Sequence, residues 1–382
     1  MNKEFEKEID LFIEKNIEYY KKLIMEIASI PAASFKEDKR AEYIMNLLDE
    51  ISVKAYTDEA KNVVVTEFLK ESYNDNLGIH LYMAHTDIVF QNEEKLTITA
   101  DDIKIYGPGV GDDTTNVAAL FMVIKFLKEK NIAIKNQIMF AFNSCEEGLG
   151  NLKGSRLLLK NYGSRIEDVI SFDLGYDKII CRAVGSKRFR INIKAQGGHS
   201  FNDFGNGNAI YYASKLIENI YEVNADKLEG KNTYNVGMIQ GGTSVNTIAQ
   251  NAEILFEYRS DNSRGMKSME DMFNRIFSEF KDKYKDIVFD VQLIGERPTE
   301  NGVDSKKIDT LVDKARSIIE RITDKTPMLT SGSTDCNTFL SKGIPSICYG
   351  TYLGKGEHTK EEYVLVDSLK YGLKIALESI DI

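Results

Sequence analysis

Histidine and cysteine are both scarce in this sequence, and their placement limits what the protein can be. Only four residues of each type occur among 382. The cysteines lie far apart and form no Cys-x-x-Cys pair; they are Cys145, Cys181, Cys336 and Cys348. We therefore expect reduced thiols and a cytoplasmic location.

Other absences exclude whole classes of partner. The net charge of −10 leaves no excess of lysine and arginine, which argues against a nucleic-acid partner. No apolar run is long enough to span a bilayer, so we expect no membrane partner. The first residues also lack the basic and then apolar stretch of a signal peptide. Neither repeats nor low-complexity tracts are visible.

The pattern of apolar residues predicts an α/β fold. Helical spacing over residues 13–27 is followed by Ser34-Phe35-Lys36-Glu37, which resembles a capping box that starts a second helix. Strand and helix patterns then alternate. The expected strands cover residues 63–65, 79–84, 137–142, 169–173 and 346–349, and the expected helices cover 117–127 and 308–319. This order predicts a mixed-sheet α/β domain with helices on both faces.

A second, smaller domain is predicted inside the first. From residue 184 the pattern becomes β-α-β-β-α-β, with strands near 189–195, 235–239, 253–258 and 287–293 and helices over 209–220 and 266–280. This order is typical of a ferredoxin-like α+β domain. The length of the chain also favours two domains. We therefore expect a larger domain over residues 1–183 and 297–382, with an inserted domain over 184–296.

Two of the histidines are placed for chemistry. His85 and Asp87 lie two residues apart at the end of the 79–84 strand, so their side chains are expected on the same side of the sheet. Asp87 can then accept the spare ring N–H of His85 while the other ring nitrogen binds a metal. His80 has the opposite parity, and we interpret it as a structural histidine.

Pairs of carboxylates follow two further elements. Asp112 and Asp113 close a glycine-rich turn and open the helix over 117–127, where an aspartate serves either as a helix cap or as a metal bridge. Glu146 and Glu147 follow the strand over 137–142, and extended backbone would point them in opposite directions. One can hold a metal while the other acts as a base, and their proximity is expected to raise one pKa. A solvated acidic loop is the alternative.

The remaining candidates lie at later strand ends. Asp173 ends the 169–173 strand and is either a terminal metal ligand or a loop cap. His358 lies in the glycine-containing loop that follows the 346–349 strand. Ligands at successive strand ends of an open α/β sheet converge in one crevice. Imidazoles and carboxylates meeting there are the ligands of a two-metal hydrolase.

Taken in order, these motifs resemble those of the M20 metallopeptidase family, which includes aminoacylases, carboxypeptidases and aminotripeptidases. The resemblance spans nearly the whole chain and implies two divalent metal ions. One would be held by His85 and Asp173 and the other by Glu147 and His358, with Asp112 bridging them. Zinc is the first choice for nitrogen and oxygen ligands without thiolate, and manganese or cobalt suits the same ligands.

The resemblance also implies roles around the metals. Glu146 would be the general base that activates a metal-bridged water, and Asp87 would orient His85. The family joins the matching pair of aspartates by a cis peptide, which we expect between Asp112 and Asp113. This chain has Thr114-Thr115-Asn116 where many relatives have lysine and a small residue, so a relative's substrate does not transfer directly.

The inserted domain resembles the family's lid and dimerisation domain, which implies a homodimer. His199, in Gly197-Gly198-His199-Ser200, would stabilise the oxyanion of a neighbouring subunit. Asn246 and Arg259 match positions that bind the substrate's backbone and free carboxylate. Gly332-Ser333-Thr334-Asp335 is expected to be a pocket loop.

We therefore expect a cytoplasmic hydrolase that cleaves an amide bond of a small peptide, as a di- or tripeptide exopeptidase. An aminoacylase acting on N-acyl amino acids is the alternative within hydrolases. Two readings come from other classes. One is a thiol hydrolase that uses Cys145. The other is a catalytically silent binding protein with the same fold.

Overall fold

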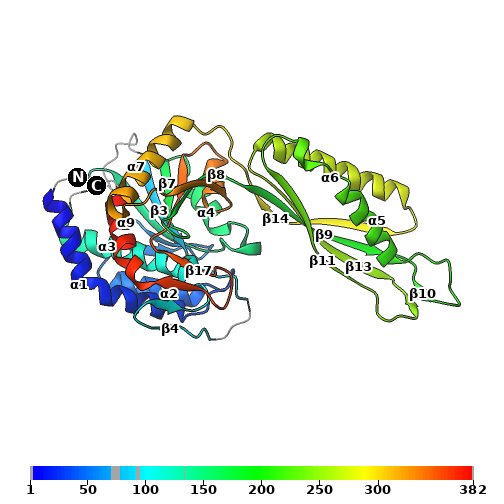
Figure 1. Cartoon of the computed structure of the whole chain (residues 1–382), viewed down its shortest axis with the longest axis horizontal. Helices are drawn as coiled ribbons and strands as arrows, with labels where there is room; N and C mark the ends of the chain where they lie inside the picture. The colour runs from blue at the N-terminus through cyan, green and yellow to red at the C-terminus, as the bar shows by residue number, and fades with distance from the viewer. Residues whose placement is uncertain (1–2, 70–77, 92–94, 133, 381–382) are drawn as a thin grey trace. The chain divides into compact units, whose positions relative to one another are not determined.

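The computed structural model describes residues 3–69, 78–91, 95–132 and 134–380 (Figure 1). The chain forms two compact units. Unit 1 contains Met1–Arg182 and Asn301–Ile382, and unit 2 contains Ala183–Glu300. Each unit has its own apolar core and is described by itself.

Unit 1 is built on a mixed sheet. Its four central strands, β6, β3, β7 and β16, are mutually parallel, and antiparallel strands flank them. Across the sheet the order is β1 (Ala55–Thr57), β2 (Val63–Val65), β6 (Gln137–Asn143), β3 (Ile79–His85), β7 (Ile166–Ser171), β16 (Ser346–Cys348), β8 (Lys178–Ala183) and β15 (Met328–Gly332). This mixed α/β arrangement agrees with the fold class expected from the sequence.

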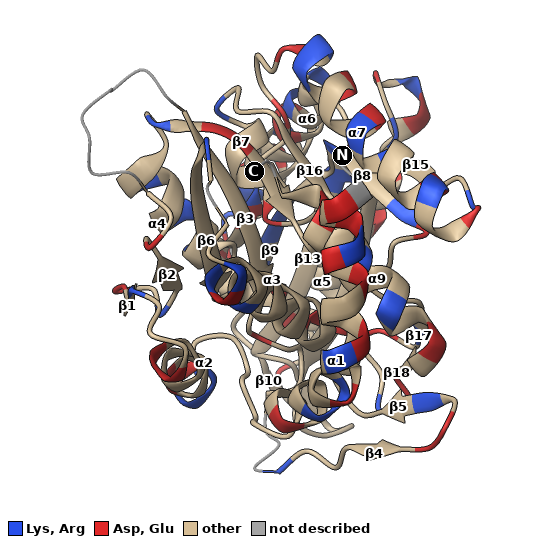
Figure 2. Cartoon of the chain, turned by 90° about the vertical axis from the view of Figure 1, so that its left-hand side faces the viewer, with Lys and Arg blue, Asp and Glu red and all other residues tan. Residues whose placement is uncertain are grey.

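Both faces of the sheet are covered. On β3, Tyr82 and Ala84 belong to one apolar cluster, whereas Leu81 and Met83 belong to the other. The first cluster includes residues of α1 (Lys3–Ala28), α2 (Asp38–Glu50), α3 (Asn116–Lys130), α7 (Ser305–Thr323) and α9 (Val366–Ser379). The second includes residues of α4 (Lys153–Tyr162) and α8 (Cys336–Leu340). Figure 2 shows α1, α3 and α9 grouped in front of the sheet.

The expected capping box at the start of α2 is wrong. The helix begins at Asp38 and has Glu37 as its N-cap, without a side-chain cap hydrogen bond. The Ser34 hydroxyl donates instead to Asp87 Oδ2 at 2.6 Å. Oε1 of the buried Glu37 accepts the N–H of Cys145 at 3.1 Å. Long-range partners around the sheet edge therefore outcompete the local cap.

A small second sheet of unit 1 has the order β17 (Gly354–Lys355), β18 (Tyr363–Leu365), β5 (Lys104–Tyr106) and β4 (Thr99–Ala100). Its central pairing is antiparallel and sets Tyr363 opposite Tyr106. This pairing joins the chain just before the glycine-rich turn to a segment more than 250 residues later in the sequence.

Unit 2 contains a four-stranded antiparallel sheet covered on one face by two helices. The strand order is β11 (Asn232–Gly241), β13 (Asn251–Ser260), β9 (Gly185–Lys194) and β14 (Val288–Arg297), and the helices are α5 (Ala209–Tyr221) and α6 (Ser263–Lys283). Alternate residues of β13, such as Ile254 and Phe256, face the helices, as a strand period of two requires. β10 (Gly198–His199) and β12 (Thr247–Ile248) form a separate two-stranded antiparallel sheet.

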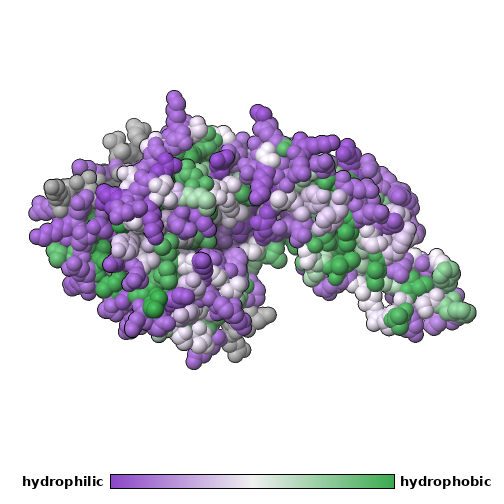
Figure 3. All heavy atoms as spheres, in the orientation of Figure 1, coloured by the Kyte–Doolittle hydropathy of each residue, from purple (hydrophilic) through white to green (hydrophobic). Residues whose placement is uncertain are grey.

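The face of the molecule seen in Figure 3 is mainly hydrophilic, with scattered apolar side chains. Apolar atoms also appear at the end of unit 2 that carries β10, where Phe201 and Phe204 are 85% and 90% exposed. Among the residues that the structure describes, no helix combines the length and apolar character needed to cross a membrane.

Candidate metal centre

Three neighbouring parallel strands bring several of the candidate ligands of unit 1 to one edge of the sheet. β3 ends at His85, β7 is followed by Asp173, and β6 is followed by Glu146 and Glu147. His358 lies in the loop between β17 and β18 of the small sheet, ten residues after the end of β16. Because the carboxyl ends of parallel strands lie at the same edge, residues distant in sequence meet there.

Asp112 lies between the two histidines. His85 Nε2 is 3.0 Å from Asp112 Oδ1, and His358 Nε2 is 3.1 Å from Asp112 Oδ2. Each carboxylate oxygen therefore faces a different imidazole. The peptide bond between Asp112 and Asp113 is cis, which confirms the expectation from the sequence.

Asp173 and Glu147 complete the two halves of the cluster. Asp173 Oδ1 is 3.9 Å from His85 Nε2, and Glu147 Oε1 is 3.1 Å from His358 Nε2. Ligand atoms of His85, Asp112 and Asp173 lie within 4.8 Å of one another, as do those of Asp112, Glu147 and His358. A third such group contains His85, Glu146 and Glu147. The structure thus brings together all five residues that were predicted to be ligands.

The donor set fits metal ions. Asp173 Oδ1 is buried and accepts no hydrogen bond from the residues that the structure describes. An orphaned carboxylate oxygen is costly in a protein interior unless a cation is near it. Nitrogen and carboxylate ligands without thiolate suit zinc, manganese or cobalt.

The buried charges perturb one another. Burial lowers the pKa of His85, but the carboxylates of Asp113, Asp112 and Asp87 outweigh it, so this pKa is raised well above its usual value. Burial raises the pKa of Asp112, but hydrogen bonds from His358 and His85 outweigh it, so this pKa is lowered. Perturbations of this kind gather at functional sites.

The hydrogen bonds of Asp87 differ from those predicted. The nearest acceptor to His85 Nδ1 is the main-chain carbonyl of Asp87, at 3.0 Å, whereas Asp87 Oδ1 is 3.5 Å away. The Asp87 carboxylate accepts the N–H groups of Glu146 and Glu147 instead, each at 2.9 Å. Asp87 therefore positions the glutamate pair as well as the histidine.

Glu146 and Glu147 are both buried, at 5% exposure each, so the alternative of a solvated acidic loop is wrong. Burial raises the pKa of the Glu147 carboxyl to about 7, and the charges of Asp112 and Glu146 add to this rise. Asp335, in the expected pocket loop, has its pKa raised to about 7, first by burial and then by the charge of Glu146. The side chain of Asn143 donates a hydrogen bond to Asp335.

Three non-glycine residues in the cluster or next to it have a left-handed backbone conformation. They are Cys145 (φ 58°), Leu174 (φ 61°) and His358 (φ 64°). This conformation costs energy in residues other than glycine and tends to gather at functional sites.

Sequence reasoning missed two supporting side chains. Asn116 donates to Asp113 Oδ1 at 2.6 Å and accepts the N–H of Thr351 at 2.7 Å, so it links the aspartate turn to the loop after β16. Glu362 is buried and accepts three N–H groups of the glycine-rich turn. Its position four residues after His358 is the only signal that the sequence offers.

Cys145 and His80 have structural surroundings. The Cys145 thiol donates to Glu37 Oε1 at 3.2 Å, and burial, followed by the charge of Glu37, raises its pKa to about 12. His80 Nδ1 lies 2.9 Å from the carboxylate of Asp168 on the adjacent strand.

Unit 2 carries the other three predicted site residues. His199 and Asn246 are neighbours, because β10 pairs with β12 and the N–H of Ser200 donates to the carbonyl of Asn246. His199 Nδ1 accepts the N–H groups of Phe201 and Asn202 at 3.3 and 3.4 Å. Because Nδ1 accepts in these bonds, the ring hydrogen lies on Nε2, which can donate it.

Arg259 lies on the open face of the unit 2 sheet. Its guanidinium makes two hydrogen bonds to Glu257, at 2.9 and 3.1 Å. Arg259 pairs with Ser186, at the other end of β13 from Asn251. At about 3.3 Å per residue, the eight residue steps from Asn251 to Arg259 place Arg259 roughly 26 Å from the end of β13 that leads towards His199.

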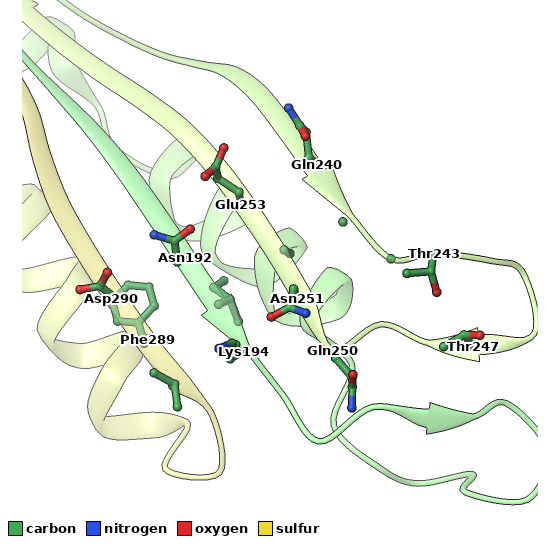
Figure 4. A pocket seen from close by; sticks show the side chains of 15 residues that line it. Asn192, Lys194, Gln240, Thr243, Thr247, Gln250, Asn251, Glu253, Phe289 and Asp290 are labelled. Carbon is green, nitrogen blue, oxygen red and sulfur yellow. The ribbon is translucent and has the colours of Figure 1, made fainter.

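The same open face contains a hollow (Figure 4). A row of polar side chains crosses it, because Gln240, Glu253, Asn192 and Asp290 lie opposite one another on the four strands. Two carboxylates without an imidazole make a weak metal site, so the cluster of unit 1 remains the candidate centre.

An α/β sheet with imidazoles and carboxylates gathered at its strand ends defines a candidate metallohydrolase. Residues 81–381 match the family described as peptidase family M20/M25/M40, and the chain belongs to this family. It is therefore an M20-type metallohydrolase. The YXEP protein of Bacillus subtilis, which shares the fold with a TM-score of 0.65 and 16% identity over 95% of this chain and 98% of that chain, is described as a dinuclear metal binding peptidase from the M20 family.

Curated relatives include both peptidases and deacetylases. The chain is 27% identical over 313 residues to carboxypeptidase G2 of Pseudomonas sp. (strain RS-16), covering 78% of this chain and 72% of that protein. It is 23% identical over 380 residues to acetylornithine deacetylase of Buchnera aphidicola subsp. Schizaphis graminum, covering 94% and 95%. A tripeptidase from Staphylococcus aureus shares the fold, with a TM-score of 0.74, 20% identity and coverage of 96% and 98%.

Proposed function

We propose that the protein hydrolyses an amide bond of a small peptide as a di- or tripeptide exopeptidase. The observation that carries this proposal is the position of Asp112, whose two oxygens face His85 and His358. His85 and Asp173 would hold one divalent ion and Glu147 and His358 the other, with Asp112 shared. We propose zinc as the metal, and manganese or cobalt as substitutes.

Bound divalent ions would lower the pKa of water and polarise the carbonyl that is attacked. Glu146 would accept the proton of the attacking water and then deliver it to the leaving amine. The hydrogen bonds from Glu146 and Glu147 N–H to Asp87 hold this segment in place, so that the base starts from a fixed position.

We further propose that unit 2 acts as the lid and dimerisation domain, with boundaries at residues 184 and 296. His199 would donate Nε2–H to the oxyanion in a partner subunit, and Asn246 would bind the substrate backbone. The exposed Phe201 and Phe204 beside His199 support an apolar contact with another chain. Arg259 would bind the substrate carboxylate, and for this it must leave Glu257.

The second candidate function is deacylation of an N-acyl amino acid. It is supported by similarity to an acetylornithine deacetylase along nearly the full length of both chains. The same base and metal ligands serve both reactions, because each breaks an amide bond. We also propose a cytoplasmic location, which suits four buried cysteines with free thiols.

The proposal is tested by metal analysis of purified protein, followed by turnover of di- and tripeptides and of N-acetyl amino acids. We expect two metal ions per chain, loss of activity with a chelator and preference for peptides. In Glu146→Gln we expect normal metal content and a loss of kcat of about 10²- to 10⁴-fold. Full turnover by this variant would remove the assignment of the base. A preference for N-acetyl substrates would favour the deacylase, and protein without metal or turnover would favour the silent binding protein.

A further inference from the structure

Glu362 is a buried carboxylate, 1% exposed, whose side chain points into the glycine-rich turn before α3. Its Oε2 accepts the N–H of Gly109 at 2.7 Å. Its Oε1 accepts the N–H groups of Gly111 and Asp112, each at 2.8 Å. One side chain therefore satisfies three main-chain donors of a turn that lies 250 residues earlier in the sequence.

Strand pairing places Glu362 at the turn. The residue directly precedes β18, which pairs with β5, and β5 directly precedes the turn. The main-chain carbonyl of Glu362 accepts the N–H of Gly107 at 3.0 Å. Main chain and side chain together thus make four hydrogen bonds to residues 107–112.

The turn has little freedom to move away from Glu362. A Cβ atom at Gly111 would lie 2.6 Å from the hydroxyl oxygen of Tyr352, so the turn packs directly against this buried ring. Gly109 has φ of +70°, a conformation that glycine adopts without strain. The N–H groups therefore converge on one place, where an acceptor with two oxygens and no hydrogen satisfies all three.

The loop that carries Glu362 also contacts the side chain of Asp112. His358, four residues before Glu362, lies 3.1 Å from Asp112 Oδ2. The segment 358–362 therefore contacts both the main chain and the carboxylate of the residue that is shared between the two halves of the metal cluster.

We propose that Glu362 is a positioning residue of the dinuclear centre, which fixes the main chain of Asp112 so that both carboxylate oxygens can serve as ligands. This inference rests on the proposed metal role of Asp112. Side chains that orient metal ligands typically contribute about 10- to 100-fold to metal affinity or activity.

The test compares Glu362→Gln with Glu361→Gln, which makes the same substitution at the exposed neighbouring residue. Glutamine has one acceptor oxygen and one N–H₂ donor, so in Glu362→Gln at least one N–H of the turn would face a donor. We expect zinc affinity, measured by competition with a chromophoric chelator, to fall about 10- to 100-fold. We expect kcat to fall with little change in KM, and Glu361→Gln to behave as the wild type.

Hydrogen exchange of residues 107–112, measured on chelator-treated protein, provides a readout independent of turnover. Exchange is expected to be faster in Glu362→Gln than in the wild type or Glu361→Gln. Wild-type zinc affinity in Glu362→Gln would overturn the proposal, whether or not exchange becomes faster. If wild-type protein bound no metal, the proposed function would fail, whereas the exchange data would still report on the turn.

Should Glu362→Gln fail to fold, Glu362→Asp takes its place. Aspartate keeps the charge and the two acceptor oxygens but is one methylene shorter, so it cannot reach all three N–H groups. Reduced zinc affinity in this variant is expected, and unchanged affinity would overturn the proposal.

Discussion

Asp87 holds Glu146 through the main chain, because Asp87 Oδ1 accepts the Glu146 N–H at 2.9 Å. In Asp87→Asn a single amide oxygen must replace two carboxylate oxygens, so one N–H of the glutamate pair loses its acceptor. We expect kcat to fall about 10- to 100-fold, with a smaller fall in zinc affinity, because His85 Nδ1 keeps the carbonyl of residue 87. Steady-state kinetics and metal competition measure the two effects separately.

Ser34→Ala serves as the milder comparison, since it removes only the hydroxyl that donates to Asp87 Oδ2. If Asp87→Asn lost zinc affinity while the remaining metal-loaded protein kept full kcat, Asp87 would act mainly on His85 rather than on the base.

The two histidines of β3 provide a matched pair for metal binding. His85 faces the carboxylate cluster, whereas His80 Nδ1 contacts the carboxylate of Asp168. We expect His85→Gln to lose at least one of two metal ions and about 10²-fold or more of kcat, because a proposed metal ligand is removed. His80→Gln should keep both ions and most activity. Metal content by elemental analysis decides the matter, and equal metal loss in both variants would contradict the assignment.

The thiol of Cys145 is predicted to be inert. Because burial and Glu37 raise its pKa to about 12, almost no thiolate exists near neutral pH. We expect iodoacetamide to label Cys145 in unfolded protein but not in native protein at pH 7.5, as measured by mass spectrometry. Cys145→Ser keeps a donor to Glu37 and should retain wild-type kcat. Loss of turnover in this variant with normal metal content would revive the thiol-hydrolase alternative.

Asp335 should make stability depend on pH. Burial raises its pKa to about 7 in the folded protein, against about 4 when unfolded, so folding favours the protonated carboxyl. This contribution is fully present below pH 4 and is lost as pH rises through 7. Relative to Asp335→Asn, the wild type should therefore lose free energy of unfolding between pH 4 and 7.

Urea denaturation of chelator-treated protein measures this difference, and Asp309→Asn on the surface of α7 is the control. A difference between the wild type and Asp335→Asn that stayed constant across this range would show that Asp335 has an ordinary pKa.

The proposed role of His199 in a partner subunit can be tested by mixing two inactive variants. In a hybrid of His199→Ala and Glu146→Gln subunits, the site with an intact Glu146 would receive an intact His199 from its partner. We expect random subunit exchange to restore roughly a quarter of wild-type activity, since half of the dimers are hybrids with one complete site. No recovery in a mixture proven to exchange subunits would mean that His199 serves its own chain.

The sequence predicted the residues at the strand ends better than it predicted the side chains that hold those residues in place. His85, Glu147 and Asp173 could be predicted to lie together, because parallel strands bring their carboxyl ends to one edge. Asp112, in the turn after β5, and His358, between β17 and β18, join them from loops of the small sheet. The side chains that support this cluster could not be predicted. Glu362 and Asn116 act through contacts between segments more than 200 residues apart, and no local pattern marks such contacts.

Local rules also failed where long-range partners were stronger. The pattern from Ser34 to Glu37 fits a helix cap. The Ser34 hydroxyl instead donates to Asp87, and Glu37 accepts the N–H of Cys145, which directly precedes the glutamate pair. The strands of the small sheet are two or three residues long, which is too short for a recognisable alternation.

The number of residues between His358 and Glu362 is constrained by two different contacts with Asp112. The ring of one must reach Asp112 Oδ2, and the carboxylate of the other must reach the N–H of the same residue. If a single residue were inserted or deleted between them, only one of the two contacts could form. Substitutions in this loop should be tolerated far better than changes in its length.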